Sequence, residues 1–355
     1  MISLVILVIT LMKFNPQPEF LAPSTDPSSQ LGLPLSGLIP QPRHYEPVMP
    51  EQLTVLGEKP AWIGGVRRLV QTATFTDFDG LIQEFRIIDR IPKAKGTTDI
   101  VMFPGCTEII TGGSFKNFTD AVAVLNPGSR VAAIESDGLN SHGTRLTAQG
   151  YFDRSFAMSG AARARSTAAF ANGRSVKCVK ESMDGAVGMH MLKYNTDTPV
   201  VDIEATVFHS DGCVTPDRVK AAMLVGFLPL LSVDLLSTMA KHPLQAVHNL
   251  ALRTDLLHPN SLEAIAAQAI HLLAGTPYAL MDEVAEYNVQ GYVKGTRDAL
   301  CQRPVLERLK KDHPNTVDVK LLRGGHAAEY DYLGSARQVQ AAFGRLACLP
   351  GPLRH

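Results

Sequence analysis

The 355-residue sequence lacks an excess of charge of either sign. Lys and Arg together number 34, and Asp and Glu also number 34, so the formal net charge is zero. Proteins that bind nucleic acids or acidic membranes usually carry clustered basic residues. The balanced composition therefore predicts neither a nucleic-acid partner nor an acidic membrane surface.

Motifs for metals and for disulfides are also missing. The 11 histidines contain no HExxH pattern, and the five cysteines are odd in number and form no CxxC pair. We therefore expect no metal and no other cofactor. Free thiols suit a reducing compartment, so the sequence favours a cytoplasmic protein over a secreted one. The cysteines are Cys106, Cys178, Cys213, Cys301 and Cys348.

A long apolar run is absent as well. The N-terminal stretch MISLVILVITLM ends before Lys13, whereas a membrane-spanning helix needs about 20 apolar residues. It also lacks the basic start and the cleavage site of a secretory signal. We interpret it as a disposable extension with Met12 as an alternative start, and a secretory signal or a membrane anchor is the alternative. Residues 1–60 carry ten prolines between Asn15 and Pro60 and are expected to form an arm on the body.

Beyond this arm, short apolar strands alternate with helical segments. Two strand-like runs flank the turn sequence TDFDG at 76–80 and predict an antiparallel hairpin. The later alternation predicts βαβ units, and thus an α/β fold with a mostly parallel sheet flanked by helices. Expected strands are 98–105, 129–138, 175–179, 198–208, 289–295 and 317–322; expected helices are 114–126, 153–173, 183–195, 304–313 and 335–346.

The alternation stops between Pro216 and Glu286. Two heavily apolar helical segments occupy residues 221–240 and 261–274. We interpret residues 214–286 as a helical cap inserted into a core made of residues 61–213 and 287–355.

A candidate catalytic serine stands where a strand meets a helix, in the sequence KESMDG. A serine hydroxyl such as that of Ser182 is a weak nucleophile unless a histidine removes its proton and an acid orients that histidine. Asp298 follows a later strand, and His326 follows the next one. The chain order Ser, Asp, His is that of the α/β-hydrolase triad.

Together with the loops DIVMFPGCTE and AIESDGLNSHG, these sites make the region from Arg67 to Leu346 resemble an α/β-hydrolase. The resemblance implies that Ser182 is the nucleophile, His326 the base and Asp298 the acid. It also implies an oxyanion hole formed by the backbone N–H groups of Met183 and Cys106.

The corner departs from the family pattern G-x-S-x-G. Lys180 and Asp184 occupy the two positions where strand and helix pass closely and glycine is favoured. Gly185 and Gly188 are expected to relieve part of this crowding. Asp211 is the alternative acid.

Other candidate residues have weaker assignments. His142 is a candidate for lining the site entrance, and His190 is expected to be structural. Cys178, on a buried strand, is expected in the core.

The sequence thus predicts a cofactor-independent serine hydrolase that cleaves a small-molecule carboxylic ester. The apolar residues of the predicted cap favour an apolar group on that ester. Three alternatives stay open: thioester, amide or C–C bond cleavage by the same triad; a non-catalytic protein that binds a small ligand; and a membrane-associated, lipase-like protein.

Overall fold

The structure of the protein is a computed structural model. It describes residues 53–77, 80–90, 98–105, 108–135, 148–182, 184–194, 198–203, 240–241, 243–252, 278–296, 303–322 and 331–352. Within these residues, no helix is both long and apolar enough to cross a membrane.

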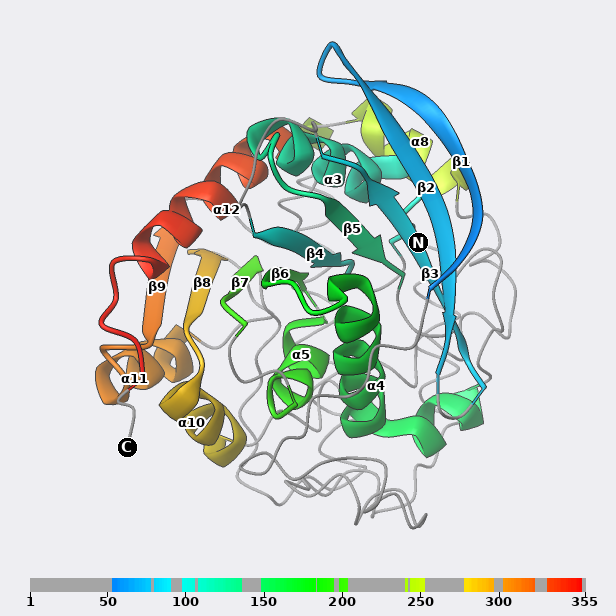
Figure 1. The fold of residues 1–355 in the computed structure, drawn as a ribbon. Coiled ribbons are helices and arrows are strands. Elements are labelled where there is room, and N and C mark those ends of the chain that lie inside the picture. The colour runs from blue at the N-terminus through cyan, green and yellow to red at the C-terminus, as the bar shows by residue number, and fades with distance from the viewer. Residues whose placement is uncertain are drawn as a thin grey trace.

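The described strands form one nine-stranded sheet with the order β1-β2-β3-β5-β4-β6-β7-β8-β9 (Figure 1). The pairs β1–β2, β2–β3 and β3–β5 are antiparallel, and all pairs from β5 to β9 are parallel. The predicted mostly parallel α/β sheet is confirmed. The strands are β1 (Thr54–Ile63), β2 (Val66–Thr76), β3 (Ile82–Ile88), β4 (Asp99–Phe103), β5 (Val131–Ile134), β6 (Val176–Glu181), β7 (Val200–Ile203), β8 (Gln290–Gly295) and β9 (Val317–Leu322).

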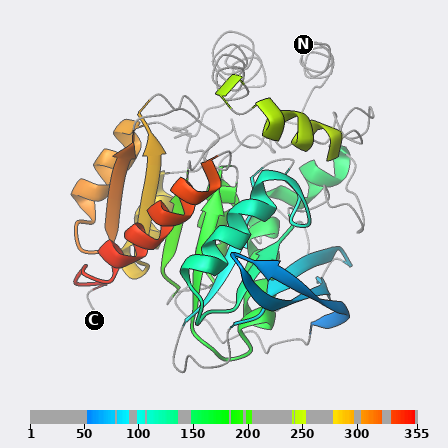
Figure 2. The same cartoon turned by 90° about the horizontal axis from the view of Figure 1, so that it is seen from above.

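Helices cover both faces of the sheet, because the central strands are apolar on both sides. On β4, Val101 and Phe103 face one cluster of buried side chains, while Ile100 and Met102 face the other. Helices α4 (Ala148–Ala171), α5 (Asp184–Leu192), α10 (Tyr278–Tyr287) and α11 (Arg303–Asp312) lie on the first face. Helices α3 (Gly113–Leu125) and α12 (Tyr332–Leu346) lie on the second, in front of the sheet in Figure 2.

The structure describes two helices of the predicted cap region 214–286 or its border. Helix α8 (Pro243–Leu252) contacts α3, and α10 packs against α5 and α11. Most of that region lies outside the described residues, so the cap and its boundaries stay a prediction.

The N-terminal edge of the sheet contains a strand that we did not predict. We expected residues 1–60 to form the arm, but residues 54–60 pair with β2 as part of β1. Most side chains of β1 are exposed, and Trp62, close to the β1–β2 turn, is 76% exposed. Strand β1 is therefore an edge strand that contributes little to the core.

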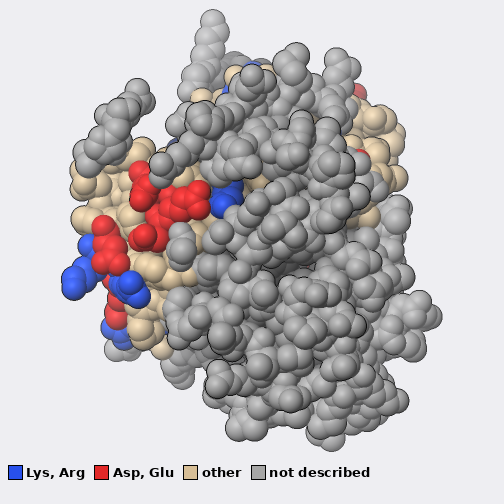
Figure 3. Space-filling model, turned by 90° about the horizontal axis from the view of Figure 1, so that it is seen from below, with Lys and Arg blue, Asp and Glu red and all other residues tan. Residues whose placement is uncertain are grey.

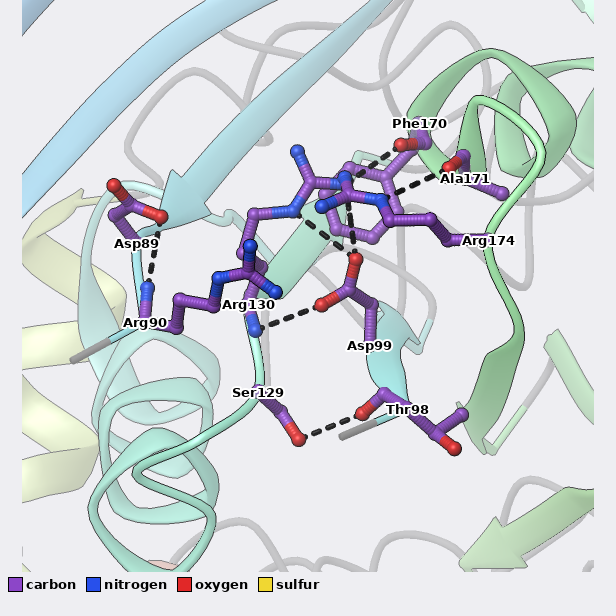
Figure 4. Close-up of polar contacts among 9 residues, drawn as sticks. All are labelled: Asp89, Arg90, Thr98, Asp99, Ser129, Arg130, Phe170, Ala171 and Arg174. Atoms are coloured by element: carbon purple, nitrogen blue, oxygen red, sulfur yellow. Dashed lines mark hydrogen bonds and ion pairs between the residues drawn. The ribbon is translucent and has the colours of Figure 1, made fainter. Parts of the chain in front are cut away.

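At the amino-terminal end of β4, the buried carboxylate of Asp99 joins neighbouring parts of the chain (Figure 4). Asp99 is 1% exposed and accepts hydrogen bonds from the backbone N–H and the guanidinium of Arg130. Arg174 lies 3.2 Å from the same carboxylate, and Arg130 also packs over the Phe170 ring. Burial raises the pKa of Asp99, while the Arg174 and Arg90 charges oppose that rise. Strand β4, the start of β5 and the end of α4 are thus held at one point.

We expect Asp99→Asn to lower the free energy of unfolding by roughly 2 kcal/mol, because the amide cannot accept all the hydrogen bonds that the carboxylate accepts from Arg130. Urea unfolding followed by far-UV circular dichroism measures this. Glu307→Gln is the control, since its ion pair with Arg303 is about half exposed and should contribute less than about 1 kcal/mol. Equal losses in both variants would contradict the prediction.

Candidate functional site

The strand order reverses between β4 and β6. From β4 the chain crosses through α3 to β5 on one side, and from β5 it returns through α4, on the opposite face, to β6. In open parallel sheets, ligands bind at such a switch point, outside the carboxyl ends of the strands. Gly105 follows β4 and Ser182 follows β6, so both lie at this point.

Ser182 forms a sharp corner between β6 and α5. Its φ angle is +50°, in the left-handed region that non-glycine residues rarely adopt. The backbone N–H of Ser182 donates to the carbonyl of Ile203 at the end of β7, 3.0 Å away. The Ser182 carbonyl in turn accepts from the N–H of Gly185, also at 3.0 Å. The corner is thus fastened both to the neighbouring strand and to the first turn of the helix.

Gly105 lies directly against this corner. A Cβ added to Gly105 would be 3.1 Å from the Ser182 Cβ and 3.7 Å from the Ser182 Oγ. The 3.1 Å spacing is tighter than ordinary van der Waals contact, which favours glycine at this position. The backbone that follows β4 therefore lies close to the Ser182 side chain.

Helix α5 is held against α4 by a second close approach. A Cβ on Gly160 of α4 would lie only 2.5 Å from the Cβ of His190 and 2.7 Å from the backbone nitrogen of Met191. His190 is buried, as expected for a structural residue. Burial lowers the pKa of His190 to about 3, and the charge of Lys193 acts in the same direction.

A buried ion pair lies under the corner, and the sequence reasoning missed it. Lys180 and Asp202 are paired positions of β6 and β7, and their side chains are 3.1 Å apart with no exposed surface. One signal was available: each is a charged residue at an interior position of an otherwise buried strand, VKCVKE and VVDI. Opposite charges inside adjacent parallel strands indicate a pair.

The other predicted site residues lie outside the described residues. These are Cys106, Met183, Asp298 and His326, together with the alternatives Asp211 and His142. Strands β8 and β9 lead to Asp298 and His326 and run parallel to β6. Their ends are joined, since the Thr296 N–H donates to the Leu322 carbonyl at 2.8 Å. Their carboxyl ends therefore lie at the same edge of the sheet as Ser182.

The core residue Cys178 is buried as expected. Among the described residues, no group of three or more His, Cys, Asp or Glu side chains could hold a metal ion.

On the face seen from below, the coloured charged side chains are of both signs (Figure 3). Lys193, directly after α5, pairs with Glu283 of α10 at 3.6 Å. The described part of this face thus presents no field of a single sign.

The comparisons with known proteins rest on structure alone. No family model and no curated protein sequence matches the chain. Solved structures do match over most of their length. An esterase from Exiguobacterium antarcticum is 16% identical with a TM-score of 0.52, covering 77% of this chain and 98% of its own. An enol-lactonase from Burkholderia xenovorans LB400 is 14% identical, with a TM-score of 0.54 and coverages of 76% and 99%.

A thermophilic esterase from Thermogutta terrifontis is similar to the same extent, at 12% identity, a TM-score of 0.53 and coverages of 78% and 99%. The protein has the α/β-hydrolase fold. The expected resemblance is thus confirmed for the architecture, including the helices on both faces of the sheet. Identities of this size carry the fold and not the activity.

We expect His190 to make the stability of the protein depend on pH. Its pKa is about 3 when folded and ordinarily 6.5, so the unfolded chain binds a proton that the folded chain rejects between these values. The contribution of neutral His190 to the free energy of unfolding is fully present above pH 6.5. It is lost as pH drops toward 3, by roughly 2 kcal/mol between pH 7 and 5. Urea unfolding of wild type and His190→Gln at both pH values measures the difference, and equal pH dependence in the two proteins would contradict this.

Proposed function

We propose that the protein is a serine hydrolase that cleaves a carboxylic ester through a Ser182–His326–Asp298 triad. The observation that carries the proposal is the corner at Ser182, a serine at positive φ between a parallel strand and a helix at the switch point of the sheet. This geometry exposes a serine hydroxyl at the top of a sheet in α/β-hydrolases. An ordinary residue that begins a helix has extended backbone instead, so a simple N-cap does not account for φ of +50°.

In the proposed reaction, the Ser182 Oγ attacks the carbonyl carbon of the ester. His326 accepts the hydroxyl proton as the bond forms, and Asp298 orients the imidazole and stabilises its positive charge. The tetrahedral intermediate then expels the alcohol, which receives the proton from His326. An acyl group remains on Ser182, and a water molecule activated by the same histidine releases the acid.

The negative oxygen of the intermediate needs hydrogen-bond donors that are already in place. We assign this role to the backbone N–H groups of Met183 and Cys106, each contributing about 3 kcal/mol to the transition state. The positions of the preceding residues support this assignment. Met183 directly follows Ser182, and Cys106 directly follows Gly105, which lies against Ser182. The first turn of α5 adds the positive end of a helix dipole.

The ester class of substrate is supported by the structures that share the fold. Two of them are named esterases and one an enol-lactonase, and a lactone is a cyclic ester. An apolar acyl or alcohol group is our expectation from the Leu, Met and Ala residues of the predicted cap.

We expect Ser182→Ala to abolish labelling by a fluorophosphonate probe and to lower kcat on p-nitrophenyl butyrate at least about 10⁴-fold. Ser175→Ala is the matched control, because this exposed serine lies at the other end of the same strand and should label like wild type. Mass spectrometry of the labelled peptide locates the adduct. An unlabelled wild-type protein that still binds small apolar molecules would favour the non-catalytic alternative.

Two substitutions test which aspartate is the acid of the triad. Asp298→Asn should lower kcat roughly 10⁴-fold, because the histidine loses the group that holds its tautomer. Asp211→Asn should retain kcat within about threefold. The measurement is steady-state hydrolysis of p-nitrophenyl butyrate by both folded variants, and the reverse pattern would move the acid to Asp211.

A further inference from the structure

The Lys180–Asp202 pair has an unusual setting for two charged side chains. Both side chains have no exposed surface, and they face each other across neighbouring strands β6 and β7 at 3.1 Å. Both lie on the face covered by α5, because Cys178 and Val200, two positions earlier in their strands, belong to the apolar cluster on that face. The pair is therefore enclosed between the sheet and the helix that leaves Ser182.

The Lys180 side chain lies against the backbone of α5 at Gly188. A Cβ at Gly188 would be 2.5 Å from the Lys180 Nζ and closer still to its Cδ. On the surface a lysine would swing away from such a methyl group. Here it is fully buried and ion-paired to Asp202, so it cannot turn out into solvent. The missing side chain at Gly188 and the presence of Lys180 thus fit each other.

We propose that Lys180 is a positioning residue for Ser182: ion-paired to Asp202 and seated against Gly188, it fixes β6, β7 and α5 at the distance that the corner requires. This inference rests on the proposed function. Lys180 precedes Ser182 by two residues, at the position where α/β-hydrolases usually have glycine. In this chain the glycine that admits the close contact lies on the helix instead, and the strand supplies the side chain that fills the gap.

We expect such a pair to affect the geometry of the corner more than the free energy of unfolding. A buried ion pair adds little stability relative to apolar side chains of the same volume, since both charges lose their hydration. It nevertheless has one favourable arrangement, because each charge must stay near the other. A strained corner persists only when its surroundings hold it from several sides. The Lys180–Asp202 pair holds it from one of these sides.

A mutant cycle between Gly188 and Lys180 tests the inference. Gly188→Ala in the wild-type background should lower the rate constant of fluorophosphonate labelling at Ser182 at least tenfold, because the new methyl group displaces Lys180. In the Lys180→Ala/Asp202→Asn background, which removes both charges and vacates the space, the same change should lower it less than twofold. Gly344→Ala is the matched control, since a Cβ in that α12 position meets no atom within 4 Å.

Rates are measured at a temperature where circular dichroism shows every variant to be folded. Equal effects of Gly188→Ala in the two backgrounds, or no effect in either, would overturn the inference. A wild-type protein that takes no label at Ser182 would instead refute the proposed function. The two failures are therefore distinguishable.

A second variant covers the case in which the double background does not fold. Asp202→Asn keeps the shape of the side chain and removes its charge, so kcat on p-nitrophenyl butyrate should fall about tenfold while KM changes less than twofold. A loss of substrate binding with unchanged kcat would contradict a positioning role. Unchanged kcat and KM in the folded variant would also overturn it.

Discussion

Close approach of backbones around helix α5 is the constraint on which the candidate site depends. The corner at Ser182 brings a strand and a helix together within a single residue of positive φ. Three glycines make this possible because glycine has no Cβ. Gly105 lies against Ser182, Gly188 lies against Lys180 of the strand, and Gly160 of α4 lies against α5. A Cβ at Gly105 would crowd Ser182 itself, one at Gly188 would crowd the Lys180 side chain, and one at Gly160 would crowd α5 at His190 and Met191.

Much of the fold could be predicted because it depends on local patterns. Short runs such as VVDI and VAAI, separated by helices, indicate buried parallel strands. The turn between β2 and β3 follows from a sequence ending at Gly80, whose φ is +81°. Each of these features is determined within about ten residues of chain.

Features that depend on register or on distant neighbours were not predictable. Strand β1 includes Pro60 and follows a proline-rich segment, so it resembles an arm until β2 is seen beside it. The partner of Lys180 became known only from the register of β6 with β7, and the contact between Gly160 and His190 only from the packing of two helices. In the candidate site, the position of Ser182 at a corner followed from the sequence, whereas the support beneath it did not.

The corner has the expected geometry although its sequence departs from the family pattern. A sequence pattern that requires glycine at positions 180 and 184 does not detect this corner, yet the chain still bends at Ser182 as the pattern would demand. Structures with 12% to 16% identity share the architecture, since a fold tolerates wide substitution where volume and polarity are kept. In this chain the glycine at the close contact is Gly188 of the helix, and the strand carries Lys180.

The placement of Trp62 has a practical consequence for anyone who studies this protein. It is the single tryptophan of the chain, and it stands on the edge strand β1 with three quarters of its surface in water. Intrinsic indole emission therefore reports on a hairpin and not on the interior. The indole is already hydrated in the native state, so the core can unfold with little shift of the emission maximum. Quenching or a shift of the emission instead indicates a change at this edge strand.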